Sequence, residues 1–261
     1  MKIAVSGKGG TGKTTVAGIL AWYFQKDGYQ VLAVDADPDA NLASAIGIPA
    51  EQARLIVPIS HQRQFIKERT GANPKQFGQL FKINPEVKDI PDRFCINFEG
   101  IKLLVMGAIQ KGGGGCACPE NTLLRSLLSE IILNRNEVVI VDMEAGIEHL
   151  GRATSQSINK MLIIVEPGSR SVSTAKMIMK LAKEIGVKSF GIVGNKIQDE
   201  QQRIWVSRQF PPDLILGMIP YHEIIRNSDL LEQPLVQLLD ENLRTEFRKI
   251  YQALGTDPEF T

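Results

Sequence analysis

The chain has 261 residues, of which 43% are hydrophobic, so it can bury a sizeable core. Its formal net charge is +1, and charge alone therefore gives no indication of a protein that binds nucleic acid or a membrane surface. No stretch reaches the roughly 18 apolar residues of a membrane-spanning helix, the N-terminus lacks the pattern of a secretory signal, and three cysteines do not make a disulfide framework. We therefore expect a protein of the reducing cytoplasm, without a stable membrane anchor.

Short β-branched runs alternate with helical patterns along the chain, which is the arrangement that builds a parallel sheet through right-handed crossovers. We expect the first strand at residues 2–5, the first helix at 14–26 and the second strand at 30–34. Later strands are expected at residues 101–106, 138–141, 161–165, 190–194 and 215–219. Most of these runs are almost continuously apolar, as is typical of strands buried on both faces.

The middle of the chain is less regular. Residues 94–98, followed by Glu99-Gly100, predict a hairpin into the next strand and hence an antiparallel edge. Residues 50–92 are polar, and we expect them to form helices and loops that decorate one face of the sheet, because about forty such residues could not build a core of their own. The sequence therefore predicts one α/β domain over residues 1–261, doubly wound, with helices on both faces of a mostly parallel sheet.

A glycine-rich loop joins the first strand to the first helix. It fits the P-loop pattern Gly-x-x-x-x-Gly-Lys-Thr in full, in the strand-to-helix context that the pattern requires. Its glycines let backbone N–H groups converge on phosphates at the positive end of the helix. Lys13 is expected to reach the β- and γ-phosphates, and the Thr14 hydroxyl to ligate Mg²⁺. The residues of this loop that we expect to bind the nucleotide are Gly9, Gly10, Thr11, Gly12, Lys13, Thr14 and Thr15.

The same loop carries a second lysine, Lys8. The string Gly7-Lys8-Gly9-Gly10-Thr11-Gly12-Lys13-Thr14 resembles the deviant Walker A box of the MinD/ParA/nitrogenase-iron-protein class of ATPases. This resemblance implies that Lys8 reaches across a face-to-face homodimer to the partner's nucleotide. A cation in that position can neutralise the charge that develops in phosphoryl transfer. The alternative is a solvated surface lysine.

Acidic residues follow the second strand, at the edge where open α/β sheets bind ligands. Asp35, Asp37 and Asp39 belong to this cluster, and carboxylates there can hold Mg²⁺ and its waters or orient an attacking water. The Asp-x-Asp-Pro run resembles switch I of the same class, which implies that Asp37 acts on the hydrolytic water and that Asp35 sits near the metal. For Asp39 a capping or turn role is the alternative.

The strand at residues 138–141 is followed by Asp142, which after a P-loop is a Walker B pattern. Asp142 is expected to hold a water on Mg²⁺, and the backbone N–H of Gly146 to contact the γ-phosphate, so that this segment is switch II. A capping aspartate is the alternative for Asp142.

Asn195 and Lys196 come directly after the strand at residues 190–194. An asparagine amide can pair with both a donor and an acceptor on the adenine edge. The resemblance places Asn195 there, with the backbone at Pro220-Tyr221 as the other wall, while a turn asparagine is the rival interpretation. We expect ATP rather than GTP, because the guanine-reading Asn-Lys-x-Asp pattern is broken by Gln198.

A Cys-x-Cys pair, Cys116 and Cys118, follows a run of four glycines. Two thiols at this spacing can both point at one soft metal. One chain supplies two ligands, and a two-fold dimer would bring two more, so a shared Cys₄ site for Ni²⁺ or Zn²⁺ is geometrically natural. The alternative is a pair of structural cysteines, which is the interpretation that we prefer for Cys95.

The Cys-x-Cys pair and the string Asp142-Met143-Glu144-Ala145-Gly146-Ile147-Glu148-His149-Leu150 are together similar to the carbon monoxide dehydrogenase accessory, or nickel-insertion, ATPases (the CooC-like family). The resemblance runs from the first strand to Pro220-Tyr221. It implies a metallochaperone that dimerises on binding ATP and delivers nickel to carbon monoxide dehydrogenase or acetyl-CoA synthase, with Cys116 and Cys118 as metal ligands. His149 could be a further ligand or a relay, but we prefer a structural role.

Two other functions stay open. One is a positioning or partition ATPase of the MinD/ParA type, whose membrane version should end in a basic amphipathic helix. We expect the apolar side of the last helix here to pack on the domain instead; it comprises Leu235, Leu239, Leu243, Phe247 and Ile250. The other is an iron–sulfur electron donor like the nitrogenase iron protein, although that protein places its cluster cysteines in two separated segments.

Overall fold

The computed structural model describes residues 1–74, 78–107, 118–135, 137–144, 150, 152–225, 227 and 234–255. Within these residues the chain forms an eight-stranded sheet with the order β3-β4-β2-β5-β1-β6-β7-β8. The strands are β1 Lys2–Gly7, β2 Val31–Ala36, β3 Ile96–Phe98, β4 Ile101–Val105, β5 Val138–Met143, β6 Lys160–Val165, β7 Phe190–Ile197 and β8 Ile215–Pro220.

The strand β3 is antiparallel to β4, and every other neighbouring pair in the sheet is parallel. The turn between β3 and β4 is tight, since Phe98 pairs with Ile101 and both Glu99 and Gly100 have positive φ. The predicted antiparallel edge and the mostly parallel sheet are therefore confirmed.

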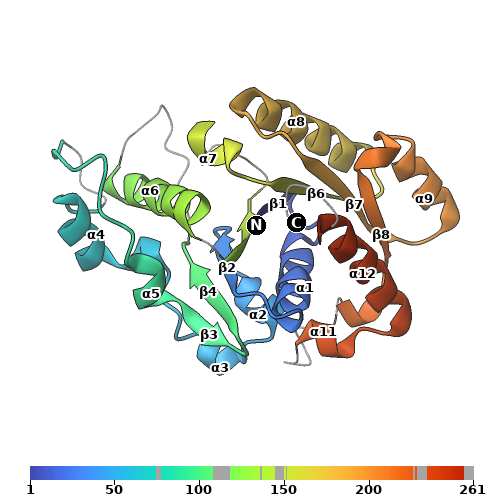
Figure 1. Cartoon of the computed structure of the whole chain (residues 1–261), viewed down its shortest axis with the longest axis horizontal. Coiled ribbons are helices and arrows are strands. Elements are labelled where there is room, and N and C mark those ends of the chain that lie inside the picture. The colour runs from blue at the N-terminus through green and yellow to red at the C-terminus, as the bar shows by residue number, and fades with distance from the viewer. Residues whose placement is uncertain are drawn as a thin grey trace.

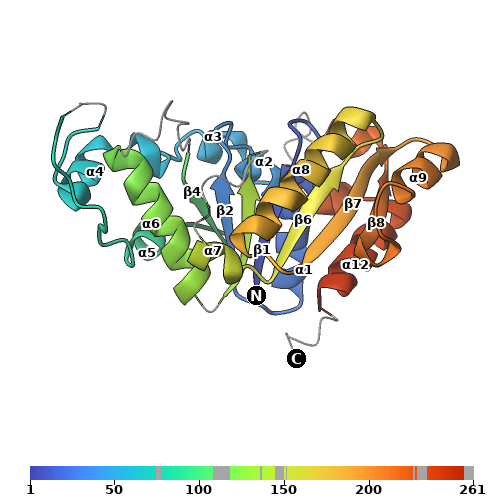
Figure 2. The same ribbon diagram turned by 90° about the horizontal axis from the view of Figure 1, so that it is seen from above.

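Helices cover both faces of the sheet (Figures 1 and 2). Buried side chains of α6 and α8 pack on one face, and those of α1, α2, α11 and α12 pack on the other, so the doubly wound arrangement is confirmed. The helices are α1 Lys13–Lys26, α2 Leu42–Ile46, α3 Ala50–Ala53, α4 Arg63–Thr70, α5 Ile90–Phe94, α6 Pro119–Asn134, α7 Arg152–Gln156, α8 Ser169–Ile185, α9 Glu200–Ser207, α11 Leu235–Leu238 and α12 Glu241–Gly255, with 3₁₀ turns at η1 Ile59–His61 and η2 Pro212–Leu214.

The central strands are mostly apolar because each of their faces is covered. In β1, Ala4 packs with the helices of one face, whereas Ile3 and Val5 pack with those of the other. All six residues of β1, β2, β5 and β6 are buried. The edge strand β3 is only partly buried, and its short sequence alternates accordingly.

The polar region at residues 50–92 forms short helices and loops, as expected. Its buried side chains between Ile59 and Ile90 join the core on the face of α6, and Arg69 of α4 pairs with Asp89 at 2.6 Å. The expectation of a single face was wrong for α3, which contacts α2 on the opposite face. Pro49 starts α3 directly after the turn at Gly47, and this places α3 beside α2.

The C-terminal apolar residues lie on two helices rather than on one. The chain is extended at Leu239, where ψ is 129°, and the carboxylate of Asp240 then accepts a hydrogen bond from the Leu243 N–H at 2.8 Å, which starts α12. The expected burial is confirmed, because Leu239 is 3% exposed and Phe247 is fully buried against the sheet.

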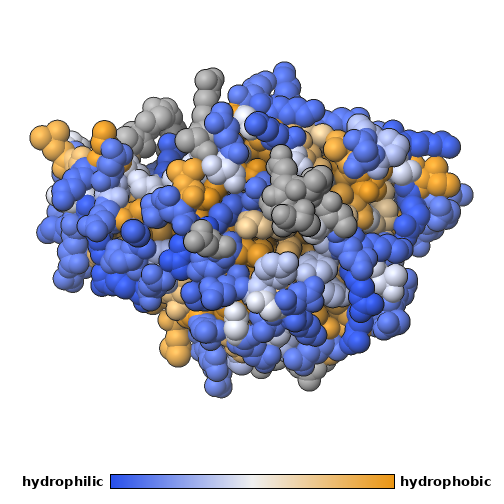
Figure 3. Space-filling model, viewed as in Figure 1, coloured by the Kyte–Doolittle hydropathy of each residue, from blue (hydrophilic) through white to orange (hydrophobic). Residues whose placement is uncertain are grey.

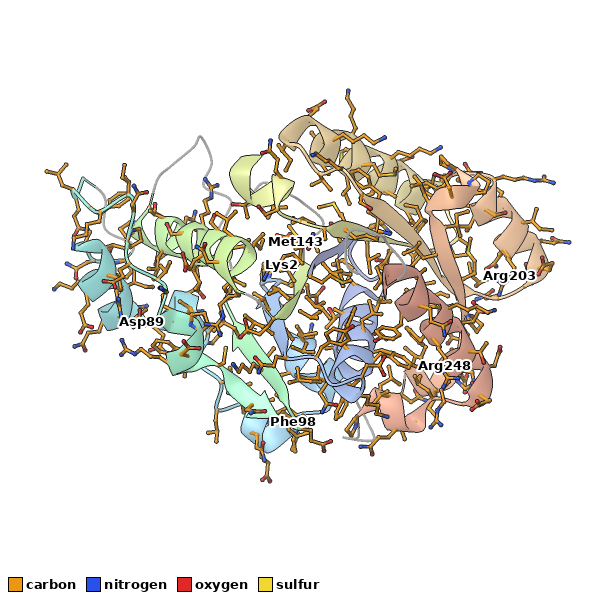
Figure 4. All side chains as sticks on the ribbon, viewed as in Figure 1. Lys2, Asp89, Phe98, Met143, Arg203 and Arg248 are labelled. Carbon is orange, nitrogen blue, oxygen red and sulfur yellow. The ribbon has the colours of Figure 1, made fainter. Side chains whose placement is uncertain are left out.

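The outer surface is mostly hydrophilic in the view of Figure 3, with hydrophobic side chains in separate patches. Figure 4 shows Asp89 beside α5 and Arg203 on α9, at the two ends of the molecule, and Arg248 on α12. In the described part of the chain, no helix combines the length and the apolar character that crossing a membrane would require.

Replacing Phe247 by alanine tests whether α12 is part of the core. We expect the Phe247→Ala variant to lose about 3–5 kcal/mol of unfolding free energy, because it leaves a cavity in a closely packed site. Arg248→Ala, on the exposed side of the same helix, should change stability by less than about 0.5 kcal/mol. Urea denaturation followed by circular dichroism measures both, and equal stabilities would contradict the packing described here.

Candidate nucleotide-binding site

The candidate site lies where the central parallel strands end together. Asp35 of β2 is the register partner of Asp142 of β5, and Val5 of β1 is the partner of Asp142 on its other side. After β1 the chain crosses to β2 on one side, whereas β6 lies on the other side of β1. Such a change of direction leaves a crevice at the carboxyl edge of an open sheet, which is where ligands bind.

The phosphate loop makes a tight turn at this edge. Its turn is held by Thr11, whose hydroxyl donates to the Lys8 carbonyl at 2.8 Å. Gly12 has a φ of 93° and leads directly into α1. A Cβ atom at Gly12 would lie 2.3 Å from Nδ2 of Asn195, so this position requires glycine for space as well as for backbone conformation. The first backbone N–H groups of α1 are left for a ligand.

A cavity of about 360 Å³ opens beside this loop. Gly9, Gly10 and the start of α1 form its polar wall, together with Asp37, Asp39 and Asn41 from the segment after β2. Ile225 and Leu235 close it on the apolar side. Sequence reasoning did not place these two apolar residues, which come from the far end of the chain, at the nucleotide site. A cavity of this size, with converging polar groups and an apolar wall, suits a small-molecule ligand.

Lys13 is buried, with 6% of its surface exposed, and therefore needs a negative partner. Asp37 supplies it: its carboxylate lies 3.8 Å from the Lys13 ammonium nitrogen. The other oxygen of Asp37 accepts a hydrogen bond from the Asp39 N–H at 3.0 Å. The structure thus brings together two of the three residues that the sequence proposed as catalytic, Lys13 and Asp37; Lys8 is the third.

Asp35 organises the segment that follows β2. Its two carboxylate oxygens accept hydrogen bonds from the N–H groups of Asp37, at 3.2 Å, and Leu42, at 2.9 Å. Burial raises the pKa of Asp35 to about 6, and the two backbone hydrogen bonds act in the opposite direction. Asp35 therefore shapes the loop that carries Asp37, in addition to lying at the edge where a metal was expected.

Asp142 is the most isolated charge at the site. It is fully buried, and neither carboxylate oxygen receives a well-formed hydrogen bond. Burial raises its pKa to about 7; the neighbouring Thr14 hydroxyl lowers the pKa and the negative charge of Asp35 raises it. A buried carboxylate beside a hydroxyl is a pair of oxygen donors that Mg²⁺ prefers, and a divalent cation would offset the cost of burying the charge. Thr14 and Asp142 therefore fit a magnesium ion.

The other loop lysine, Lys8, is more exposed and pairs with Glu166, which sequence reasoning missed. The Lys8 ammonium lies 3.5 Å from Oε1 of Glu166, with side-chain exposures of 40% and 26%. Lys196 lies 3.5 Å from Oε2 of the same carboxylate and donates to the Gly10 carbonyl at 2.6 Å. Glu166 directly follows β6, so the rule that selected Asp35 and Asp142, a carboxylate at the carboxyl end of a buried strand, would have found it.

Asn195 holds the phosphate loop in place through a hydrogen bond. Its amide Nδ2 donates to the Thr11 carbonyl at 2.7 Å, and its Oδ1 accepts from the N–H of Lys196 at 2.9 Å. Pro220 ends β8 beside it, where the Tyr221 N–H donates to the Ile197 carbonyl at 2.8 Å. The expected contacts of Asn195 and Pro220 with adenine stay predictions.

Of the two candidate thiols, Cys118 stands at the start of α6. Its Sγ accepts a hydrogen bond from the Asn121 N–H at 3.4 Å. Burial raises the pKa of the Cys118 thiol, and this hydrogen bond opposes the shift. Cys116, Gly146 and His149 lie outside the described residues. Within the ranges that the structure describes, no cluster of three or more metal-binding side chains occurs.

Comparison with known proteins gives related sequences and folds. The model of the CobQ/CobB/MinD/ParA nucleotide binding domain matches residues 2–235. The carbon monoxide dehydrogenase accessory protein CooC of Rhodospirillum rubrum is 46% identical over 88% of this chain and 87% of its own. An uncharacterized ATP-binding protein of Methanocaldococcus jannaschii is 45% identical over 97% of both chains. In fold, the chain resembles the MinC:MinD cell division protein complex of Aquifex aeolicus, with a TM-score of 0.69 and 19% identity over 98% of this chain and 95% of that one.

Replacing Asp142 by asparagine tests the magnesium site. Without nucleotide, at pH 8, the Asp142→Asn variant should melt several degrees above the wild type, because it removes a buried charge without a close partner. The rise in melting temperature that Mg²⁺ adds in the presence of ATP should be lost. Asp92→Asn, an exposed aspartate of α5, is the control, and an unchanged response of Asp142→Asn to Mg²⁺ would place the ion elsewhere.

Proposed function

Because this chain belongs to the CobQ/CobB/MinD/ParA family of nucleotide-binding proteins and to its CooC-like members, we propose that it is an ATP-dependent metallochaperone of the cytoplasm. It dimerises on binding ATP, hydrolyses it, and delivers nickel to carbon monoxide dehydrogenase or acetyl-CoA synthase. Residues 1–261 form one P-loop ATPase domain. The observation that carries the proposal is the pairing, in one chain, of a P-loop with an accessible second lysine and a Cys-x-Cys segment.

The described site supports ATP hydrolysis through a division of roles. The loop N–H groups at Gly9, Gly10 and Gly12 bind phosphate oxygens, together with the N–H groups of Thr11 and Thr15. Lys13 exchanges Asp37 for the γ-phosphate, and Asp37 is then free to orient the attacking water. Water attacks the γ-phosphorus and gives up a proton, the bond from phosphorus to the bridging oxygen breaks, and ADP and inorganic phosphate leave. Bound Mg²⁺ would supply charge neutralisation, held by Thr14 and through water by Asp142, with Asp35 nearby.

Lys8 supports the dimer because its side chain reaches the surface next to the cavity. A second protomer that docks face to face on this edge would receive the Lys8 ammonium beside its own nucleotide. There the charge would stabilise the transition state, as an arginine finger does. Neither protomer alone would complete the site, so hydrolysis would depend on assembly.

The metal cargo would bind between the protomers. Cys116 and Cys118 of each chain supply two thiolates, and the two-fold axis makes four, which suits Ni²⁺ or Zn²⁺. Since the Cys118 pKa lies above its usual range, metal binding would release protons. Coupling to the nucleotide would pass through switch II: the Ser6 hydroxyl of β1 donates to the Glu144 carbonyl at 3.3 Å, and Gly146, two residues on, is proposed to sense the γ-phosphate.

The buried apolar side of α12 makes this helix unavailable as a membrane anchor of the MinD/ParA type. A membrane anchor needs an apolar face that is free to insert, whereas Phe247 and Ile250 of α12 are fully buried. The adjacent spacing of the two thiols likewise favours a metal carrier over an iron–sulfur electron donor. Ni²⁺ binding by a protein that shows no iron–sulfur absorbance would support the metal carrier over the iron–sulfur electron donor.

Replacing Lys8 by alanine tests its role across the dimer. The Lys8→Ala variant should hydrolyse ATP about 100-fold more slowly or worse, since it loses a charge that acts on the transition state. ATP affinity of the monomer should change little, because Lys13 still holds the phosphates. Lys26→Ala, which removes the same charge at the far exposed end of α1, is the control. Full activity of Lys8→Ala would mean that no lysine acts in trans.

Removing both thiols tests the cargo site. The variant Cys116→Ser with Cys118→Ser should lose Ni²⁺ and Zn²⁺ binding but keep ATP binding, whereas the wild type should bind one divalent ion per dimer. Equilibrium dialysis with metal analysis measures this, and activation of nickel-free carbon monoxide dehydrogenase measures delivery. Cys95→Ala is the matched control, because burial raises the pKa of its thiol to about 12 and makes it a poor ligand. Unchanged metal affinity of the double variant would move the site elsewhere.

A further inference from the structure

Each lysine of the phosphate loop faces a carboxylate of its own chain. Lys13 faces Asp37 at 3.8 Å in a largely buried pair, and Lys8 faces Glu166 at 3.5 Å in a partly exposed one. The proposed function explains the first pair, since Lys13 is proposed to exchange Asp37 for the γ-phosphate. It leaves the second pair unexplained, because a lysine that acts across a dimer has no need of a partner in its own protomer.

Glu166 is held in place by two rigid elements. It directly follows β6, whose residue Ile164 pairs with Gly7 at the start of the phosphate loop. Its backbone N–H donates to the hydroxyl of Ser171 in α8 at 3.1 Å, and Ser171 is 2% exposed. The backbone of Glu166 is thereby fixed beside the loop, so that only the side chain can adjust.

The carboxylate of Glu166 pairs with two lysines, one of which is held by a further hydrogen bond and one of which is more exposed. Lys196 is tied to the loop, since its ammonium donates to the Gly10 carbonyl at 2.6 Å, and its backbone has a φ of 58°. Lys8 contacts the other carboxylate oxygen from a side chain that is 40% exposed. If Lys8 leaves, Lys196 remains to balance Glu166, so departure of Lys8 does not strand a charge and costs little.

We propose that Glu166 is a positioning residue that holds Lys8 on its own protomer, and that ATP-driven dimerisation exchanges this contact for the partner's nucleotide. The inference rests on the proposed function, because it presumes that Lys8 acts in trans. The phosphates of ATP carry more negative charge than one carboxylate and therefore attract the Lys8 ammonium more strongly than Glu166 does. Without ATP, Lys8 stays paired with Glu166 of its own protomer, and this contact disfavours a dimer that holds no nucleotide.

The first test needs no dimer. In the nucleotide-free protein, the Lys8 amine should react with acetic anhydride about two- to threefold faster in Glu166→Gln than in the wild type, since an exposed ion pair is worth at most about 1 kcal/mol. Mass spectrometry of the labelled peptides gives the rate, and Lys26 serves as the internal reference. Equal rates of Lys8 labelling would overturn the proposal.

The second test measures the exchange itself. With Mg²⁺ and a non-hydrolysable ATP analogue, the dimer dissociation constant from sedimentation should be about 3- to 20-fold lower for Glu166→Gln, because two exposed ion pairs break in each dimer of the wild type. In about 1 M salt, which screens exposed charges, the difference should vanish. Glu200→Gln, which removes the carboxylate that pairs with Arg203 on α9 at 3.6 Å, is the control and should behave as the wild type.

The two tests separate the proposals. Faster Lys8 labelling without dimers under any nucleotide condition would support the contact and sink the proposed ATP-dependent dimer. A wild type that dimerises with the analogue, alongside a Glu166→Gln variant with an unchanged dissociation constant, would sink the role of Glu166 and leave the proposed function standing. A difference that persists in high salt would also overturn it, since that would indicate a change of structure rather than of charge.

Discussion

The burial of charge at one edge of the sheet is the constraint on which the rest of this structure depends. Lys13, Asp35 and Asp142 are all removed from water at the carboxyl ends of β1, β2 and β5. Burial of charges is costly unless they are paired or hydrogen-bonded. Asp37 pairs with Lys13 and backbone N–H groups satisfy Asp35, whereas Asp142 is left without a close partner. The fold therefore builds a site that a nucleotide and a cation complete.

The same constraint explains why distant parts of the chain meet at the phosphate loop. The carbonyls of Gly10 and Thr11 lie in the tight turn of the loop, and the end of β7 supplies their hydrogen-bond donors: Lys196 donates to the Gly10 carbonyl and Asn195 to the Thr11 carbonyl. Glu166 at the end of β6 then balances the added lysine. The two lysines of the loop thus differ in their exposure to solvent. Lys13 is buried and paired with Asp37 of its own protomer, and Lys8 lies at the surface, where the proposed function needs it.

Much of the fold was readable because it follows from local rules. Nearly continuous apolar runs predicted the buried parallel strands, and the turn residues Glu99-Gly100 after residues 94–98 predicted the antiparallel edge of β3 and β4. The sequence pattern also predicted that the apolar residues from Leu235 to Ile250 are buried, but it did not predict that they divide between α11 and α12. Periodicity continues smoothly across Leu239, and only the packing of both helices against the sheet, with Asp240 starting the second, breaks it.

The sequence by itself determined the phosphate loop, the carboxylates at Asp35, Asp37 and Asp142, and the family, because contiguous residue types at fixed spacing specify those motifs. Only the tertiary structure decided which charges meet. Glu166 and Lys8 are far apart in the chain, and Ile225 and Leu235 reach the cavity from its far end. Crossover connections between parallel strands bring such residues together, and their partners depend on strand order, which no local pattern encodes.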